Sequence, residues 1–149
     1  MKKKVLISTG GSGGHVLPAI TIYEHLKFRY TILISTDLRG LKYLDKENYK
    51  TITINTPKLN NLLLLPFALL KIFVLTIKCI ILLKKEKISI LISTGGYMSL
   101  PLCLAAKVLC IKIILIEPNM VLGRANKFFL NFSEKLLSYS KNLINLPKR

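Results

Sequence analysis

The sequence predicts an α/β fold, a Rossmann-like doubly wound sheet of parallel strands with helices on both faces. Short apolar runs end at Gly, Asp or Pro and are followed by longer helical patterns, which is the alternation of βαβ units. The tetrapeptide Leu-Ile-Ser-Thr also occurs at 6–9, 33–36 and 91–94, each time where a predicted strand ends, and two copies continue into Gly-Gly. Because parallel strands end at one edge of an open sheet, these sites share the edge where such folds bind ligands.

The predicted elements alternate along the whole chain. The expected strands lie near residues 4–9, 30–35, 51–55, 88–94, 112–117 and 135–139. The expected helices lie near residues 17–28, 39–46, 66–86, 99–109 and 123–131. A length of 149 residues suits one compact α/β domain with a hydrophobic core and is short for two. We therefore expect a single domain over residues 1–149.

Composition favours an ordered protein that contacts a membrane. Apolar residues make up 51% of the chain and the mean hydropathy is +0.45, both high for a soluble domain. The 23 Lys and Arg against 7 Asp and Glu give a net charge of +16, which attracts phosphates, nucleic acid or anionic lipid alike. Together with the glycine loops described next, this charge leads us to expect phosphate and anionic lipid and no nucleic acid.

The three cysteines indicate buried thiols in a reducing compartment. Cys79, Cys103 and Cys110 lie in apolar runs, without metal-like spacing or a nearby cluster of His. We therefore expect neither a disulfide framework nor a metal site. The basic N-terminus is followed by an apolar run of about four residues, which is too short for a signal-peptide core. These features predict a cytoplasmic chain.

The first glycine-rich segment, Gly10 to His15, joins the first predicted strand to a helix whose opening we place near Pro18. Exposed amide groups at a helix start bind anions, and clustered glycines let a ligand approach the backbone closely. The segment therefore predicts a diphosphate site.

Two phosphate-binding motifs can be compared with this segment. A P-loop is excluded, because no Gly-Lys-Ser/Thr follows the glycines. The dinucleotide fingerprint fits more closely, since Gly11 and Gly13 give its first two glycines, although Val16 occupies the third position. Asp37 ends the second strand about where a ribose-binding acid belongs. A nucleotide-binding oxidoreductase module therefore remains an alternative.

Two more strand ends carry polar groups. Gly95-Gly96-Tyr97 follows the fourth predicted strand, and Ser99 is expected to cap the next helix. Facing helix starts can hold one diphosphate from two sides, while Tyr97 either contacts a sugar or simply packs. Glu117 and Asn119 follow the fifth strand, ahead of Asn126, and suit sugar hydroxyls, although Asn after Pro is also an ordinary turn residue.

Together these three segments resemble the MurG family of glycosyltransferases, over roughly residues 5 to 140. The resemblance implies a GT-B fold and inverting transfer of N-acetylglucosamine from UDP-N-acetylglucosamine to the 4-hydroxyl of a muramoyl-pentapeptide on undecaprenyl diphosphate, in peptidoglycan synthesis. It implies no required metal or other cofactor, and makes this chain the N-terminal, acceptor-binding half. The substrate-binding residues expected by position are Ser12, Gly13, Gly14, Gly95, Gly96, Tyr97, Asn119 and Asn126.

The transfer needs a base that takes the proton of the acceptor hydroxyl. His15 is the first candidate, because histidine side chains titrate near neutral pH, and Glu117 is the alternative. Three positions depart from the family pattern: Ser12 stands where Thr is usual, and Ile116 and Pro118 replace the His and Gln expected around Glu117.

The segment Leu62 to Leu83 is about long enough to cross a bilayer, but two lysines bring its predicted insertion free energy close to zero. A spanning helix would also separate strands that must share one sheet. We expect the helix to lie on an anionic membrane surface, with a fully buried core helix as the alternative. The expected membrane-facing residues are Phe67, Leu70, Lys71, Phe73, Val74, Ile77, Lys78 and Lys85.

These features place the protein on the cytoplasmic face of the plasma membrane, as a peripheral protein. Because the sequence ends at Arg149, where a donor-binding domain would be expected to begin, we expect either a fragment lacking the C-terminal UDP-sugar domain or a partner of a separate donor-binding subunit, as in the split transferase of the dolichol pathway. A non-catalytic membrane-surface protein is a further hypothesis.

Overall fold

The computed structural model describes residues 2–45, 47–57 and 63–147 and confirms the predicted α/β fold. Within these residues one parallel sheet has the strand order β3-β2-β1-β4-β5-β6. This order reverses at β1, which leads to β2 on one side and pairs with β4 on the other. The strands are β1 (Lys4–Ser8), β2 (Thr31–Thr36), β3 (Thr51–Thr53), β4 (Ile88–Ser93), β5 (Lys112–Glu117) and β6 (Lys135–Ser138).

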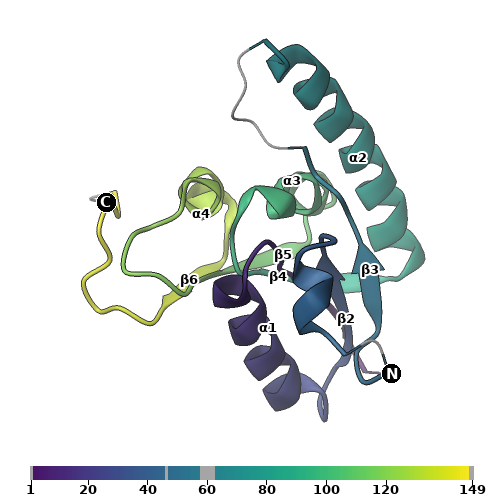
Figure 1. The fold of residues 1–149 in the computed structure, drawn as a ribbon. Helices are drawn as coiled ribbons and strands as arrows, with labels where there is room; N and C mark the ends of the chain where they lie inside the picture. The colour runs from purple at the N-terminus through teal and green to yellow at the C-terminus, as the bar shows by residue number, and fades with distance from the viewer. Residues whose placement is uncertain (1, 46, 58–62, 148–149) are drawn as a thin grey trace.

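The helices cover both faces of the sheet, as expected for a doubly wound fold. Helix α1 lies on one face, and α2, α3 and α4 lie on the other (Figure 1). Three short 3-10 turns also occur among the described residues. The bounds are α1 (Gly13–Leu26), η1 (Gly40–Tyr43), α2 (Leu65–Lys85), η2 (Tyr97–Ser99), α3 (Leu100–Val108), α4 (Arg124–Phe129) and η3 (Leu130–Phe132).

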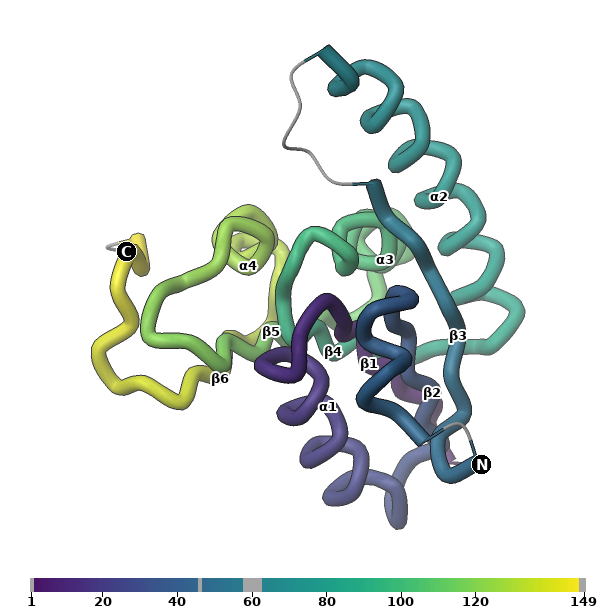
Figure 2. Tube along the Cα trace, in the orientation of Figure 1, coloured from purple at the N-terminus to yellow at the C-terminus, as the bar shows by residue number. Residues whose placement is uncertain are grey.

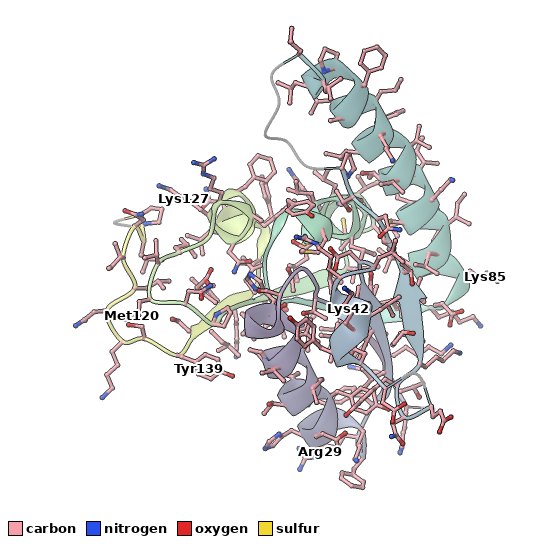
Figure 3. The ribbon with its side chains drawn as sticks, in the orientation of Figure 1. Arg29, Lys42, Lys85, Met120, Lys127 and Tyr139 are labelled. Carbon is pink, nitrogen blue, oxygen red and sulfur yellow. The ribbon has the colours of Figure 1, made fainter. Side chains whose placement is uncertain are left out.

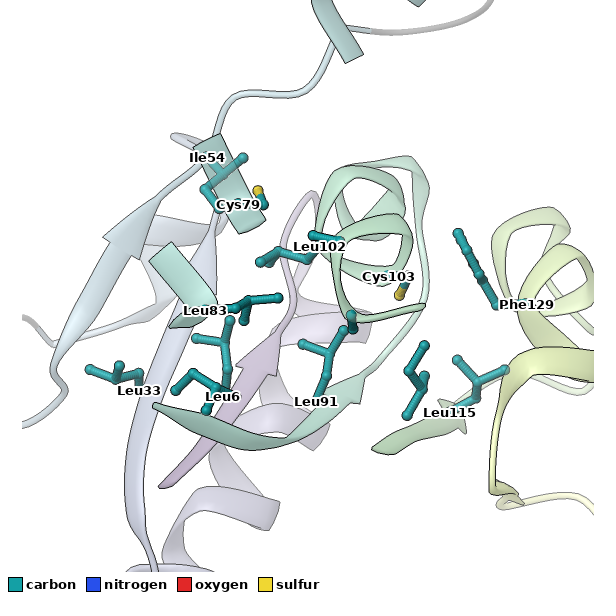
Figure 4. Packing of buried hydrophobic residues seen from close by; sticks show 14 residues of the cluster. Leu6, Leu33, Ile54, Cys79, Leu83, Leu91, Leu102, Cys103, Leu115 and Phe129 are labelled. Carbon is teal, nitrogen blue, oxygen red and sulfur yellow. The ribbon is translucent and has the colours of Figure 1, made fainter. Parts of the chain in front are cut away.

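Successive residues of the central strands supply the two cores. Leu6 of β1 belongs to the cluster between the sheet and α2, α3 and α4, while its neighbours Val5 and Ile7 belong to the cluster beneath α1. This alternation is the two-residue period of a strand that is buried on both faces. Figure 4 shows the first cluster, in which Leu6, Leu91 and Leu115 of the sheet face Leu83, Leu102 and Phe129 of the helices.

Helix α1 begins at Gly13, about four residues before the predicted start. The amides of His15 and Val16 donate to the carbonyl oxygen of Ser12 at 3.1 and 3.2 Å, so the glycine segment itself forms the first helical turn. Pro18 therefore lies in the second turn of the helix, whereas the sequence predicted it in the first turn. The amides exposed at this helix start belong to the glycine segment.

The helix predicted over residues 39–46 is wrong, since residues 39–45, the described part of this range, hold only the turn η1. The side chain of Asp45 accepts hydrogen bonds from the amide of Glu47 at 3.0 Å and from the side chain of Asn48 at 2.6 Å. Such local bonds from Asp and Asn favour turns over helices. The helix predicted over residues 123–131 is likewise shorter, with α4 followed by η3.

Helix α2 is buried along one side only. Ala68, Ile72, Cys79 and Leu83 are buried, and the C-terminal part of the helix packs beside α3. Its N-terminal turns extend beyond the sheet (Figure 1). By length and composition α2 could cross a membrane, but β3 before it and β4 after it belong to the same sheet. Leu62, where the predicted apolar segment starts, lies outside the described residues.

The C-terminal segment lies beside the loop between β5 and α4. Ile144 forms a parallel bridge with Val121, and the amide of Leu122 donates to the carbonyl oxygen of Ile144 at 3.0 Å. Figure 2 shows this segment running along that loop, at the far side of the molecule from the N-terminus. These contacts hold the loop that follows the fifth strand.

Candidate functional site

The loops after β1 and β4 meet because these two strands are neighbours. The Nδ1 atom of His15 lies 2.7 Å from the carbonyl oxygen of Thr94, and the hydroxyl of Thr94 donates to the hydroxyl of Thr9 at 2.9 Å. Both threonines are fully buried. The two glycine loops are therefore joined at the point where the strand order reverses, which is where doubly wound sheets bind ligands.

The contact with Thr94 assigns the protonation pattern of the His15 ring. A carbonyl oxygen only accepts hydrogen bonds, so the hydrogen of a neutral imidazole lies on Nδ1. The Nε2 atom then carries the free lone pair. His15 lines the main cavity of the described structure, so this nitrogen can act as a base on a ligand there.

The second loop needs glycine for its conformation. Gly95 and Gly96 have φ values of 87° and 82°, in the left-handed region that side chains rarely adopt. A Cβ atom on Gly95 would lie 2.9 Å from the side-chain nitrogen of Asn126. The loop therefore approaches α4 as closely as the backbone allows, which brings Gly96 and Tyr97 to the cavity.

Asp37, which follows β2, accepts hydrogen bonds that fix the first glycine loop. Its Oδ1 accepts from the amides of Gly11 and Gly40 at 2.8 and 2.9 Å, and its Oδ2 accepts from Nε of Arg39 at 3.1 Å. Burial raises the pKa of Asp37, but these donors outweigh it, and the pKa lies below its ordinary value of 3.8. Both oxygens serve the protein itself, so the ribose-binding role is not supported.

Arg39 connects the loop after β2 to the loop after β4, which the sequence did not suggest. Besides its ion pair with Asp37, its guanidinium donates to the hydroxyl of Tyr97 and lies 5.7 Å from the centre of that ring. Tyr97 is thereby oriented at the rim of the cavity. Only its place directly after the second strand could have drawn attention to Arg39.

Glu117 is 1% exposed, yet its carboxylate has four hydrogen-bond donors. Oε1 accepts from the amide and the side chain of Asn119 at 3.2 and 3.0 Å. Oε2 accepts from the amide of Gly123 and the side chain of Asn126, each at 2.9 Å. Asn126 also donates to the carbonyl oxygen of Ile116 at 3.0 Å. This network fixes the loop after β5 and presents Asn119 at the cavity.

A cavity of about 790 Å³ adjoins these loops, and its wall has a polar and an apolar part. The polar part includes five of the predicted residues, namely His15, Gly96, Tyr97, Glu117 and Asn119. Ser12, Gly13 and Gly14 lie at the N-terminus of α1, with Ser12 and Gly14 exposed, while Gly95 and Asn126 are buried. The remaining lining residues are Leu69, Ile72, Leu100, Leu104, Gly123, Arg124, Ala125 and Phe128.

All eight residues expected to face a membrane are exposed on α2. The outward side chains of this helix stand clear of the fold, with Lys85 labelled near its end (Figure 3). The apolar side chains between the lysines have little to pack against in the described structure, which is the arrangement of an interfacial helix. These residues are Phe67, Leu70, Lys71, Phe73, Val74, Ile77, Lys78 and Lys85.

The family profile and the relatives of similar sequence agree on one family of glycosyltransferases. The profile of the glycosyltransferase family 28 N-terminal domain matches residues 5–138. The chain is 51% identical over 148 residues to the UDP-N-acetylglucosamine--N-acetylmuramyl-(pentapeptide) pyrophosphoryl-undecaprenol N-acetylglucosamine transferase of Pelagibacter ubique (strain HTCC1062), covering 99% of this chain and 42% of that protein. The protein of the same name from Wolbachia sp. subsp. Brugia malayi (strain TRS) is 42% identical, over 87% of this chain and 37% of its own length.

A solved structure confirms the fold assignment. The crystal structure of Acinetobacter baumannii MurG superposes with a TM-score of 0.82 at 23% identity, over 98% of this chain and 44% of that one. The chain thus spans about two-fifths of the length of the relatives it matches. The resemblance predicted from the three loops is confirmed, and the oxidoreductase alternative is not supported.

Proposed function

This chain belongs to the glycosyltransferase family 28 N-terminal domain family, and from this premise we infer the role that its site supports best. Residues 1–149 are the acceptor-binding domain of an inverting transferase. The enzyme moves N-acetylglucosamine from UDP-N-acetylglucosamine to a lipid-linked N-acetylmuramyl-pentapeptide in peptidoglycan synthesis, the reaction for which the relatives are named. The donor nucleotide is held by another part of the enzyme, on the same polypeptide or on a separate subunit.

One observation carries this proposal: the imidazole of His15 lies at a cavity beside two glycine loops. When the acceptor hydroxyl attacks the anomeric carbon of the donor sugar, its proton passes to Nε2 of His15. The new C–O bond forms as the bond to UDP breaks, so UDP leaves with the electron pair and the configuration inverts. The resulting imidazolium keeps its Nδ1–H bond to Thr94, which stabilises the charge.

Glu117 acts in this proposal as a positioning residue. Its carboxylate accepts four hydrogen bonds from Asn119, Gly123 and Asn126, so both of its oxygens are already engaged by the protein. It holds Asn119 where that side chain can donate to a sugar. Asn126 supports Glu117 from the buried side, and Ser12 and Gly14, exposed at the N-terminus of α1, can reach the donor.

Membrane attachment follows from the outer face of α2. Phe67, Phe73 and Val74 would enter the headgroup region, while Lys71 and Lys78 would contact anionic lipid. The helix cannot leave the sheet side without unpacking Cys79 and Leu83 from the core. The protein is therefore peripheral, on the cytoplasmic face where the nucleotide-sugar donor is available.

Transfer of labelled N-acetylglucosamine to the lipid-linked acceptor tests this function. The chain is joined to the part of the Pelagibacter ubique relative that lies beyond the matched segment, and the lipid product is separated by chromatography. The joined protein is expected to form product, and the chain alone is expected to bind the acceptor without turnover. A folded joined protein that forms no product would contradict the proposal.

A further inference from the structure

The cavity beside His15 extends well beyond the loops, into a groove between helices. Its lining includes Leu69 and Ile72 of α2 and Leu100 and Leu104 of α3. Phe128 of α4 also lines it. A volume of about 790 Å³ lies within the range of roughly 300–1,000 Å³ that small-ligand sites occupy. The groove therefore has room for more than the sugar and diphosphate at its polar end.

We propose that this apolar groove holds the first isoprenoid units of the acceptor's lipid chain, so that the lipid leaves the site between α2 and α4. The inference rests on the proposed function, because it concerns the same acceptor. It deepens that function by assigning a separate binding surface to the lipid itself, distinct from the outer face of α2 that meets the membrane.

The kinds of group that line the cavity match the kinds of group in such a substrate. His15 and Asn119 supply polar groups for the reacting sugar. Arg124, at the start of α4, adds a positive charge to the lining, and that charge complements a diphosphate. Leu104 and Phe128 add apolar surface, where polyprenyl carbons would replace water.

Two wall residues are exposed although they are apolar. Leu69 is 52% exposed and Phe128 is 60% exposed, on two helices that face one cavity. Apolar side chains gathered around one opening indicate a binding surface more than scattered ones do. Leu69 also adjoins Leu70 on the outer face of α2, so a lipid leaving the groove would pass directly to the membrane-facing side chains.

Titration calorimetry of the 149-residue chain, in buffer free of lipid and detergent, tests this with farnesyl diphosphate and inorganic pyrophosphate. Farnesyl diphosphate is expected to bind at least about tenfold more tightly, since each buried methylene adds to affinity. Leu69→Gln and Phe128→Ala are expected to remove most of that difference and leave pyrophosphate binding unchanged. The matched controls, Ile81→Gln and Phe28→Ala, change exposed apolar residues away from the cavity and should preserve it.

Two results would overturn the inference. The first is equal affinity for the two probes. The second is an equal loss of farnesyl diphosphate binding in all four variants, which would mean that any exposed apolar side chain collects the lipid. If the joined enzyme transfers sugar but Leu69→Gln and Phe128→Ala do not affect farnesyl diphosphate binding, the groove assignment fails and the proposed function stands. Loss of both sugar transfer and farnesyl diphosphate binding would contradict the proposed function and the groove assignment.

Discussion

The Nδ1 atom of His15 and the carbonyl oxygen of Thr94 lie 2.7 Å apart, and through them the first glycine loop is attached to the second. The proposed base at the end of one loop is thus oriented by the backbone of the other. The geometry depends on β1 and β4 being neighbours in the sheet, although α1, β2, β3 and α2 lie between them in the sequence. The following predictions test this arrangement and the elements that support it.

Replacing the proposed base should stop transfer without unfolding the protein. His15→Ala in the joined enzyme is expected to lower kcat by about 10²–10⁴-fold, the usual contribution of a positioned general base. His25→Ala is the control, because His25 lies on the same helix and its Nδ1 also contacts a carbonyl oxygen, that of Thr21 at 2.8 Å, but the side chain is exposed. Equal rates for both variants would exclude His15 as the base.

The carboxylate of Glu117 should be needed for stability. In Glu117→Gln an NH₂ group replaces one oxygen that now accepts two hydrogen bonds, so donors would face donors. A loss of about 1–3 kcal/mol in the free energy of unfolding is expected, as for other buried groups left unpaired. Urea denaturation measures it, with Glu134→Gln as the exposed control. Unchanged stability would mean that the loop after β5 does not depend on this network.

Asp37 should make stability depend on pH in the acid range. The pKa of Asp37 is lowered in the folded state. Its contribution to the free energy of unfolding is therefore complete above the ordinary pKa of 3.8 and is lost as the pH falls through the lowered pKa. Asp37→Asn is expected to be less stable at pH 7 and to lose less stability on acidification to about pH 3. Urea denaturation at several pH values measures both, and Asp45→Asn, at an exposed turn, should keep the acid dependence of the original chain.

The close approach at Gly95 should not tolerate a side chain. Gly95→Ala combines a φ of 87° with a Cβ atom 2.9 Å from Asn126, so about 1–3 kcal/mol of destabilisation is expected. Gly14→Ala is the matched change, because Gly14 is helical and its nearest neighbour would lie 3.7 Å away, and it should be neutral or slightly stabilising. Thermal unfolding separates the two. Similar melting temperatures would contradict the contact between the second loop and α4.

Binding to anionic vesicles should depend on the lysines of α2. Each lysine near such a surface contributes about 1 kcal/mol, so the double variant Lys71→Gln with Lys78→Gln is expected to bind roughly tenfold or more weakly. The control is Lys135→Gln with Lys141→Gln, which removes the same charge elsewhere on the surface. Cosedimentation with phosphatidylglycerol vesicles measures the difference. Equal losses would show that net charge, and not the face of α2, drives binding.

The order of strands and helices could be predicted because each strand is an apolar run that ends at a recognisable turn residue. The glycine segments and Glu117 identified the sheet edge for the same reason. The contacts of His15 with Thr94 and of Arg39 with Tyr97 could not be predicted, since they join loops that are distant in sequence. The burial of Ile72 beside exposed Leu69 was also inaccessible, because apolar residues occur on every side of that helix and only packing distinguishes the buried ones.

The position of α2 between β3 and β4 has a consequence for the newly made chain. Lys4 of β1 pairs with Ile88 of β4, so the centre of the sheet cannot close until α2 has been synthesised. During that interval the ribosome carries a nascent segment of 21 residues, mostly apolar and basic, whose partners in the core are not yet complete. Early contact with the bilayer would shield this segment from aggregation, so the helix that we propose for membrane attachment would also protect the chain while it folds.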